Sequence, residues 1–197
     1  MERPNKAQRL QAEFVIEAYR QGFFPMADSV TGGISWYSPD PRAIIPLETF
    51  HVPQSLKRIL RKREFDIRVD TAFEEVIGGC ADRPETWISS EIKEVYCDLH
   101  RKGFAHSVES WRGGKLVGGL YGVAIGAGFF GESMFSRRSN ASSVALASLV
   151  VRLRERNFRL LDSQFINAHI ARFGAIEISR ELYLRLLKNV VGDPVSF

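Results

Sequence analysis

The sequence predicts an α+β fold, in which helices flank a mixed sheet and a small N-terminal lobe comes before it. From residue 65 onward, segments with apolar residues at every second position alternate with segments of helical period. A glycine pair and capping serines stand where turns and helix starts are needed. A content of 45% hydrophobic and 25% charged residues is ordinary for a globular chain. We expect the lobe to span residues 1–63 and a larger domain to span residues 64–197.

The first third of the chain predicts two helices joined by an irregular segment. Between Gln8 and Arg20 the apolar residues lie near one helical face, and Gly22 follows as a stop. Residues 22–46 are rich in Gly and Pro and predict short strands at most. Residues 53–63 predict a second, very basic helix.

A clearer pattern starts at residue 65. Phe65, Ile67 and Val69 alternate with polar residues, which predicts a half-buried strand. Thr71 and Glu74 have the spacing of a capping box and predict a helix to about residue 77. The remaining predicted elements are a helix at 89–102, strands at 104–111, 115–124 and 126–131 with the first turn at Gly113-Gly114, a helix at 140–156, a strand at 158–162, a short helix ending near Gly174, a strand at 175–178 and a helix capped by Ser179.

The chain carries a mild positive charge. Its 27 Lys and Arg residues exceed its 23 Asp and Glu residues, which fits a polyanionic partner without requiring one. Cys80 and Cys97 lie too far apart for a CxxC motif, so we expect reduced core thiols. The N-terminus lacks the apolar region of a signal peptide, and no segment has the length of an apolar membrane helix. We therefore expect a cytoplasmic protein with no membrane partner.

The order of predicted elements from residue 65 is β-α-α-β-β-β-α-β-α-β-α. This order resembles the acyl-CoA N-acyltransferase superfamily, in which helices flank a mixed sheet. The resemblance implies an acetyltransferase-like catalytic domain over residues 64–197. A fold alone does not specify a substrate.

Four longer segments resemble one family of transferases. They are AYRQGFFPMAD (18–28), WYSPDPR (36–42), GESMFSRRSNAS (131–142) and LLDSQFINAHIARFGA (160–175). The shorter motifs TWI (86–88) and VGGLYGVAIG (117–126) also fit. Together these motifs resemble the leucyl/phenylalanyl-tRNA–protein transferase family over nearly the whole chain.

This resemblance implies an aminoacyltransferase. Its donor would be Leu-tRNA or Phe-tRNA (Met less well), and its acceptor a protein with N-terminal Arg or Lys, which the product marks for N-end rule degradation. The apolar donor pocket that the resemblance implies consists of Leu120, Phe129, Met134 and Leu149. The residues implied at the adenosine and the tRNA are Trp36, Trp87 and Arg42. From the sequence alone, the apolar and aromatic members of both sets are also typical core residues.

Aminoacyl transfer from tRNA places few demands on a protein. The ester is already activated, so aminolysis needs alignment, a proton acceptor and a stabiliser for the developing oxyanion. The sequence has no P-loop and no cluster with metal-ligand spacing, and His106 and Glu109 would point to opposite faces of a strand. We therefore expect no metal and no cofactor.

Three carboxylate and amide residues are candidates for the catalytic chemistry. Asp162 and Gln164 end a predicted strand on the same face, so the carboxylate is expected to bind the side-chain amide N–H. The alternative is a polar strand end that caps the next helix. Glu132 ends an apolar strand, where a carboxylate is costly to bury unless it is paired. It is expected to meet the cationic acceptor, or else it is an ordinary residue before a helix.

Two basic segments are candidates for contacts with tRNA. Ser136, Arg137 and Asn140 precede the predicted N-terminus of a long helix, which favours an anion such as the phosphate of the terminal adenosine. The alternative is simple capping by Asn140. In the predicted basic helix, Arg58, Arg61 and Arg63 favour contact with the acceptor stem or form only a solvated face.

Two rival functions remain at this stage. The first is a coenzyme A-dependent N-acetyltransferase, although the segment after Phe135 lacks the glycines of a pyrophosphate loop. The second is a non-catalytic tRNA-binding protein of the same fold, although the chain retains Asp162, Gln164 and Glu132.

Overall fold

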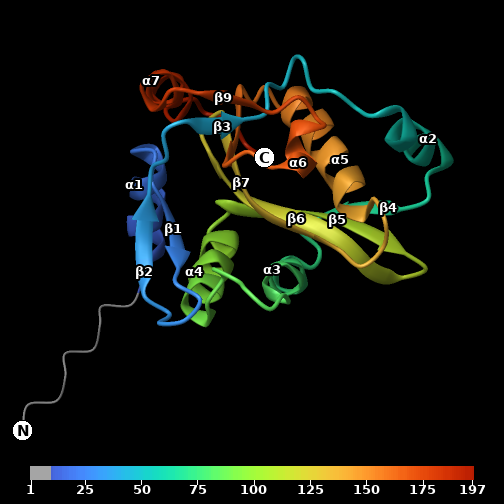
Figure 1. Cartoon of the computed structure of the whole chain (residues 1–197), viewed down its shortest axis with the longest axis horizontal. Helices are drawn as coiled ribbons and strands as arrows, with labels where there is room; N and C mark the ends of the chain where they lie inside the picture. Colours follow the sequence, from blue (N-terminus) through green and yellow to red (C-terminus); the bar gives the residue numbers. More distant parts are fainter. Residues whose placement is uncertain (1–9) are drawn as a thin grey trace, which may run out of the picture.

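The computed structural model describes residues 10–197 and confirms the predicted α+β class (Figure 1). Seven strands form one sheet in the order β4-β5-β6-β7-β8-β3-β9, and two form a separate hairpin. The strands are β1 Phe24–Ala27, β2 Ile34–Tyr37, β3 Arg42–Ile44, β4 Asp66–Val69, β5 Ala105–Arg112, β6 Lys115–Ile125, β7 Gly128–Ser136, β8 Leu160–Gln164 and β9 Ile176–Ile178. The helices are α1 Ala12–Arg20, α2 Gln54–Lys62, α3 Phe73–Ala81, α4 Ser90–Arg101, α5 Ala141–Glu155, α6 Ala168–Ala171 and α7 Arg180–Val190.

The large sheet is mixed, as predicted. All its neighbouring strands are antiparallel except β7 and β8, which run parallel. In Figure 1, α5 and α6 lie on one face of the sheet and α3 and α4 on the other. Each face has its own apolar cluster, one containing Phe130 and Tyr96 and the other Phe129 and Leu149. The element order predicted from residue 65 is confirmed throughout.

The N-terminal third is less separate than the sequence suggests. The first helix begins at Ala12, and Gln8, where we expected it to begin, lies outside the described residues. The β1-β2 hairpin lies beside α1 and α4 (Figure 1). However, β3 belongs to the large sheet, where it pairs with β8 and β9. The division of the chain at residue 63 stays a prediction.

The predicted capping box at the start of α3 is wrong. The helix begins at Phe73, and its N-cap residue makes no side-chain hydrogen bond to the backbone. Instead, the buried Glu109 carboxylate of β5 accepts hydrogen bonds from the backbone N–H groups of Thr71 and Ala72, each at 2.8 Å. A carboxylate at a helix N-terminus satisfies free N–H groups and opposes the helix dipole. A tertiary contact therefore replaces the local cap.

A β-bulge in β7 sets the geometry of the region described below. Tyr121 of β6 pairs with Ser133 and Gly122 pairs with Gly131, so Glu132 is the extra residue. The bulge reverses the alternation of side chains along β7. As a result Met134 packs on the same face as Phe129, although the two are five positions apart and regular alternation would put them on opposite faces. The strand also runs to Ser136, five residues beyond the predicted end. The polar residues of this stretch, which the sequence suggests as part of a loop, belong to the strand and line a cavity.

Substitution of Gly122 by Ala is expected to destabilise the protein. A Cβ atom there would meet the backbone oxygen of Phe130 and lie 2.5 Å from Cε1 of Phe129. Overpacking of this kind costs roughly 1–3 kcal/mol. Urea unfolding of Gly122→Ala measures the loss, and Gly192→Ala is the control, since no atom lies within 4 Å of its added Cβ. Equal stability of the two variants would contradict this account of the bulge.

Candidate active site

The main cavity lies where β7 and β8 diverge. Their pairing ends at Phe130 and Asp162, but β7 continues beside β6 to Ser136. The opening between them leads into a cavity of about 420 Å³, a size typical of small-molecule sites. Its walls come from β6, β7, β8, α5, α6 and the connection between α3 and α4.

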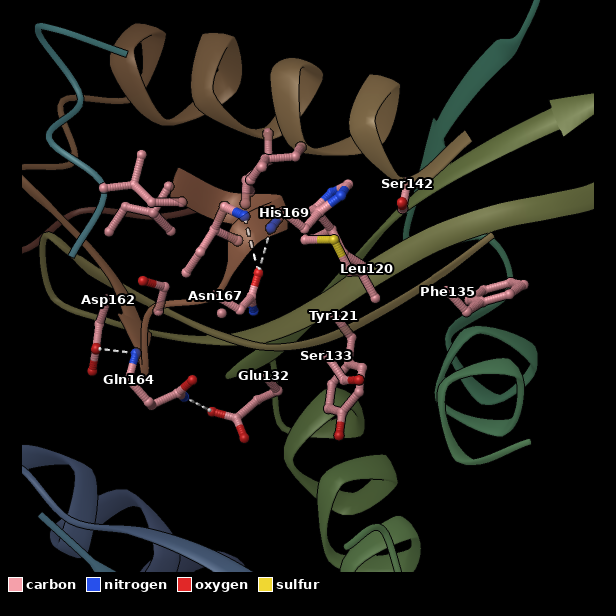
Figure 2. Close-up of a pocket in the computed structure, with 18 of the residues that line it drawn as sticks. Leu120, Tyr121, Glu132, Ser133, Phe135, Ser142, Asp162, Gln164, Asn167 and His169 are labelled. Atoms are coloured by element: carbon pink, nitrogen blue, oxygen red, sulfur yellow. Dashed lines mark hydrogen bonds between the residues drawn. The ribbon is translucent and has the colours of Figure 1, made fainter. Parts of the chain in front are cut away.

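One end of the cavity is a network of hydrogen bonds around Glu132, of which Figure 2 shows the one from Gln164. The Glu132 carboxylate accepts from Tyr19 Oη at 2.6 Å, from Tyr96 Oη at 3.1 Å and from Gln164 Nε2 at 2.9 Å. The two tyrosines come from α1 and α4 and are fully buried. Burial raises the pKa of both hydroxyls well above the ordinary value, so they remain donors at neutral pH.

The Glu132 carboxyl titrates near neutrality. Burial raises its pKa from 4.5 to about 7, against the opposing effect of the hydrogen bonds from Tyr19 and Tyr96. The negative charge of Asp162 raises this pKa further, and Arg42 lowers it. A carboxyl of this kind can exchange a proton at physiological pH, and an approaching cation favours its ionised form.

Asp162 is held from three sides and has no exposed surface. Arg42 donates to both carboxylate oxygens, from Nε at 3.0 Å and from Nη2 at 2.6 Å, and Tyr183 Oη donates at 2.8 Å. Burial is the largest single influence on the pKa of Arg42 and lowers it, but Asp162, Tyr183 and Tyr19 together raise it more, so its net pKa lies above the ordinary value. Such a pair fixes its neighbours firmly because both charges are satisfied.

The expected bond between the Asp162 carboxylate and the Gln164 side chain is wrong. Asp162 accepts instead from the backbone N–H of Gln164 at 2.9 Å. Gln164 has a φ of 57°, so the chain leaves the strand geometry there and its amide turns toward Glu132 (Figure 2). The structure thus brings the three predicted residues together in the order Asp162, Gln164, Glu132.

Arg42 does not have the exposure that contact with tRNA requires. Besides Asp162, its guanidinium contacts the Gly22 carbonyl at 3.2 Å and lies over the rings of Phe24 and Tyr183. It has no exposed surface, so it is a positioning residue for Asp162, and the expectation that it binds tRNA is corrected.

The other end of the cavity is apolar. Of the four residues expected for the donor pocket, Leu120, Met134 and Leu149 line the cavity. Phe129 is fully buried in the apolar cluster behind them and does not line it. Further apolar lining residues that the sequence did not single out are Ile45, Leu146, Leu161 and Ile170.

The residues expected at the adenosine and the tRNA are spread more widely. Trp87 and Ser136 line the cavity, whereas Trp36, Arg137 and Asn140 do not. The Asn140 side chain makes no cap hydrogen bond; Ser136 Oγ accepts from the backbone N–H of Ser142 instead. Arg58 and Arg61 of α2 and Arg63, which follows the helix, are exposed and lie outside the cavity.

Sequence reasoning missed four side chains that shape this site. Tyr19, Tyr96 and Tyr183 stand in amphipathic helices, where nothing in the pattern separates them from core aromatics. Arg83 lines the cavity from the α3–α4 connection, which the sequence shows only as a polar loop. Only the tertiary fold brings these residues to the carboxylates.

The sequence matches a known class of enzyme, the aminoacyltransferases. One family model, described as leucyl/phenylalanyl-tRNA protein transferase, matches residues 44–188, and a model of the N-terminal domain of that transferase matches residues 8–40. The chain belongs to the leucyl/phenylalanyl-tRNA–protein transferase family. Among residues 10–197, no helix combines the length and apolar character needed to cross a bilayer.

Relatives from several bacteria support this membership. The transferase of Herpetosiphon aurantiacus is 55% identical over 96% of this chain and 98% of its own length. That of Gloeobacter violaceus is 53% identical over 95% and 97%. That of Paramagnetospirillum magneticum is 53% identical over 95% and 92%. All three bear the name leucyl/phenylalanyl-tRNA–protein transferase.

Replacement of Glu132 by Gln is expected to change the pH dependence of stability. A folded-state pKa of about 7 lies above the ordinary 4.5, so the folded protein keeps a proton that the unfolded chain loses. The free energy of unfolding of the wild type should therefore fall between pH 5 and 7 and level off above, relative to Glu132→Gln. Urea unfolding at four pH values measures the difference. Glu85→Gln, at an exposed position, is the control, and parallel wild-type and Glu132→Gln profiles would sink the assignment.

Proposed function

We propose that this chain transfers Leu or Phe, and less well Met, from charged tRNA to proteins that begin with Arg or Lys. The transfer would take place in the cytoplasm and mark the acceptor for N-end rule degradation. The observation that carries the proposal is one cavity that joins an apolar pocket to a carboxylate–amide network. Such a cavity suits an apolar acyl donor at one end and a cationic amine at the other.

The apolar end suits the donor side chain. Leu120, Met134 and Leu149 offer an apolar lining, made adaptable by the unbranched Met134, that suits a leucyl or phenylalanyl group. Ile and Val carry an extra methyl at Cβ, close to the reacting ester. A misplaced methyl in an apolar pocket costs roughly 1–3 kcal/mol, which gives selectivity by shape.

The polar end suits the acceptor. Its α-amine has a pKa of about 7.7–8.0, so a modest fraction is neutral at physiological pH and a strong base is unnecessary. The Gln164 amide donates through Nε2 to Glu132, and its carbonyl oxygen is suited to accept a proton from the attacking amine. Glu132 attracts the cationic N-terminus, while Asp162 fixes the Gln164 backbone.

The leaving group is the tRNA with its free 3′-oxygen. Amine attack forms the C–N bond, the ester C–O bond breaks, and the amine proton passes through the Gln164 oxygen toward that leaving oxygen. Trp87, which lines the cavity, suits the adenine base, with Trp36 of β2 as a second candidate, and the exposed arginines of α2 suit the acceptor stem. The seven-stranded sheet with its single parallel pair supports an acetyltransferase-like fold for this domain.

Purified protein is expected to transfer Leu and Phe from tRNA to peptides that begin with Arg or Lys, after EDTA treatment and without nucleotide. Ile-tRNA should be a poor donor because of its Cβ methyl, and peptides that begin with Glu should be poor acceptors because of Glu132. Transfer of radiolabelled amino acid measures both. Acetylation supported by coenzyme A in place of aminoacyl transfer would contradict the proposal.

Replacement of Gln164 by Ala should lower single-turnover transfer by roughly 10²-fold or more, because a positioned proton acceptor contributes 10²–10⁴-fold. Affinity for Phe-tRNA and melting temperature should change little. Gln21→Ala is a matched control: Gln21 Nε2 also donates to a Glu at 2.9 Å, but on exposed α1 surface. A loss of stability with preserved turnover per folded molecule would show that Gln164 only ends the strand.

A further inference from the structure

We propose that Arg83 binds the phosphate that joins the terminal adenosine to the rest of the tRNA 3′ end. The inference rests on the proposed function, since it concerns how the same cavity recognises its donor. It deepens that function by naming the residue that separates a nucleic-acid donor from a bare aminoacyl nucleoside.

The Arg83 side chain is anchored in place before any ligand arrives. Its Nε donates to the Cys80 carbonyl at 2.8 Å, and Nη2 donates to Ser133 Oγ at 3.1 Å and to the Met134 carbonyl at 3.4 Å. These partners are neutral, so the positive charge is not cancelled by them. Because Arg carries five N–H donors in a fixed fork, donors remain for a ligand.

Arg83 is also the one Lys or Arg that lines the cavity in the described part of the chain. The residue is exposed, in contrast with Arg42, so it stands at the mouth, where the cavity opens to solvent. Two further arginines, Arg137 and Arg138, follow β7, and neither lines the cavity; Arg137 lies over the Phe135 ring. Arg83 is therefore the residue that can supply the positive charge for a phosphate at the mouth.

The position of Arg83 fits the shape of a tRNA end. Trp87 stands four residues further along the same α3–α4 connection and lines the same mouth, where its half-buried ring suits a base. At the other end the charge of Asp162 is paired with Arg42, so the ionised Glu132 carboxylate is the group that repels a phosphate. Charge thus runs from positive at the mouth to negative inside, which orients a donor whose anionic end must stay out.

Two aminoacyl substrates distinguish a contact with the phosphate from an effect on the chemical step. Phe-tRNA carries the phosphate, whereas phenylalanine esterified to adenosine alone does not. In Arg83→Ala, KM for Phe-tRNA should rise about 10-fold or more, as expected for loss of a charged hydrogen bond, with kcat little changed. KM for phenylalanyl-adenosine should stay within about twofold, because that donor makes no such bond.

Salt dependence supplies a readout that does not need activity. For single-stranded nucleic acid, log K falls with log [salt] by about 0.7 per neutralised phosphate. Arg83→Ala should therefore bind tRNA with a slope smaller by about 0.7, and Arg83→Lys should keep the wild-type slope because it keeps the charge. Arg101→Ala is the control, since Arg101 lies on α4 away from the main cavity and pairs with Asp98.

The outcomes decide between binding and structural roles. Equal loss with both donors, together with a lower melting temperature, would mean that Arg83 only ties α3 to β7, and would overturn the inference. An unchanged salt slope in Arg83→Ala would overturn it as well. If the wild type transfers from neither donor, the proposed function fails, and the slope of tRNA binding still decides whether Arg83 neutralises a phosphate.

Discussion

The buried ion pair between Arg42 and Asp162 is the contact on which the rest of the site depends. It joins β3 to β8, and through the Gly22 carbonyl and Tyr183 it also joins the N-terminal segment and α7. Removing two charges from water is costly, and the pair is tolerable because every strong donor and acceptor in it has a partner. Breaking such a pair by removing one member typically costs about 3–5 kcal/mol. The backbone N–H of Gln164 donates to Asp162, so the position of the Gln164 side-chain amide depends on the ion pair that fixes Asp162.

The same network explains why an acid with a pKa near neutrality can stand beside a fixed carboxylate. Asp162 is paired with an arginine, whereas Glu132 receives only neutral donors from two tyrosines and an amide. Two carboxyl groups in one cavity thus differ in environment: an arginine holds Asp162, and the raised pKa of Glu132 lets it change its charge near neutral pH. Under the proposed function, this difference separates the residue that holds the geometry from the residue that meets the acceptor.

Much of the fold could be predicted from the sequence, because alternating apolar residues and capping residues are signals that lie within one segment. The alternation at Phe65, Ile67 and Val69 and the cap at Ser179 correspond to elements of the structure. The features that could not be predicted depend on residues distant in the sequence. Glu109 replaced the local cap of α3, and an unpaired residue at Glu132 extended β7 through polar positions. No pattern in a single segment reveals either feature.

The candidate site was predictable only in part for the same reason. Asp162, Gln164 and Glu132 lie together as expected, yet their bonding order depends on a positive φ at Gln164 and on tyrosines from two helices. Arg42 was expected to contact the tRNA. The sequence motif shows that an arginine is present, but it does not show that this arginine is buried against Asp162. Burial and pairing are properties of the assembled sheet, which explains this error.

Because of the bulge at Glu132, the number of residues in β7 decides which side chains face the cavity. In the present register Met134 faces the apolar pocket and Phe135 packs against Gly79 of α3. Deletion of a single residue there would leave composition and charge nearly intact, but it would exchange the faces of every side chain after it. The Phe135 ring and the Met134 side chain would then exchange faces of the sheet. Insertions and deletions in this strand should therefore be far less tolerated than substitutions.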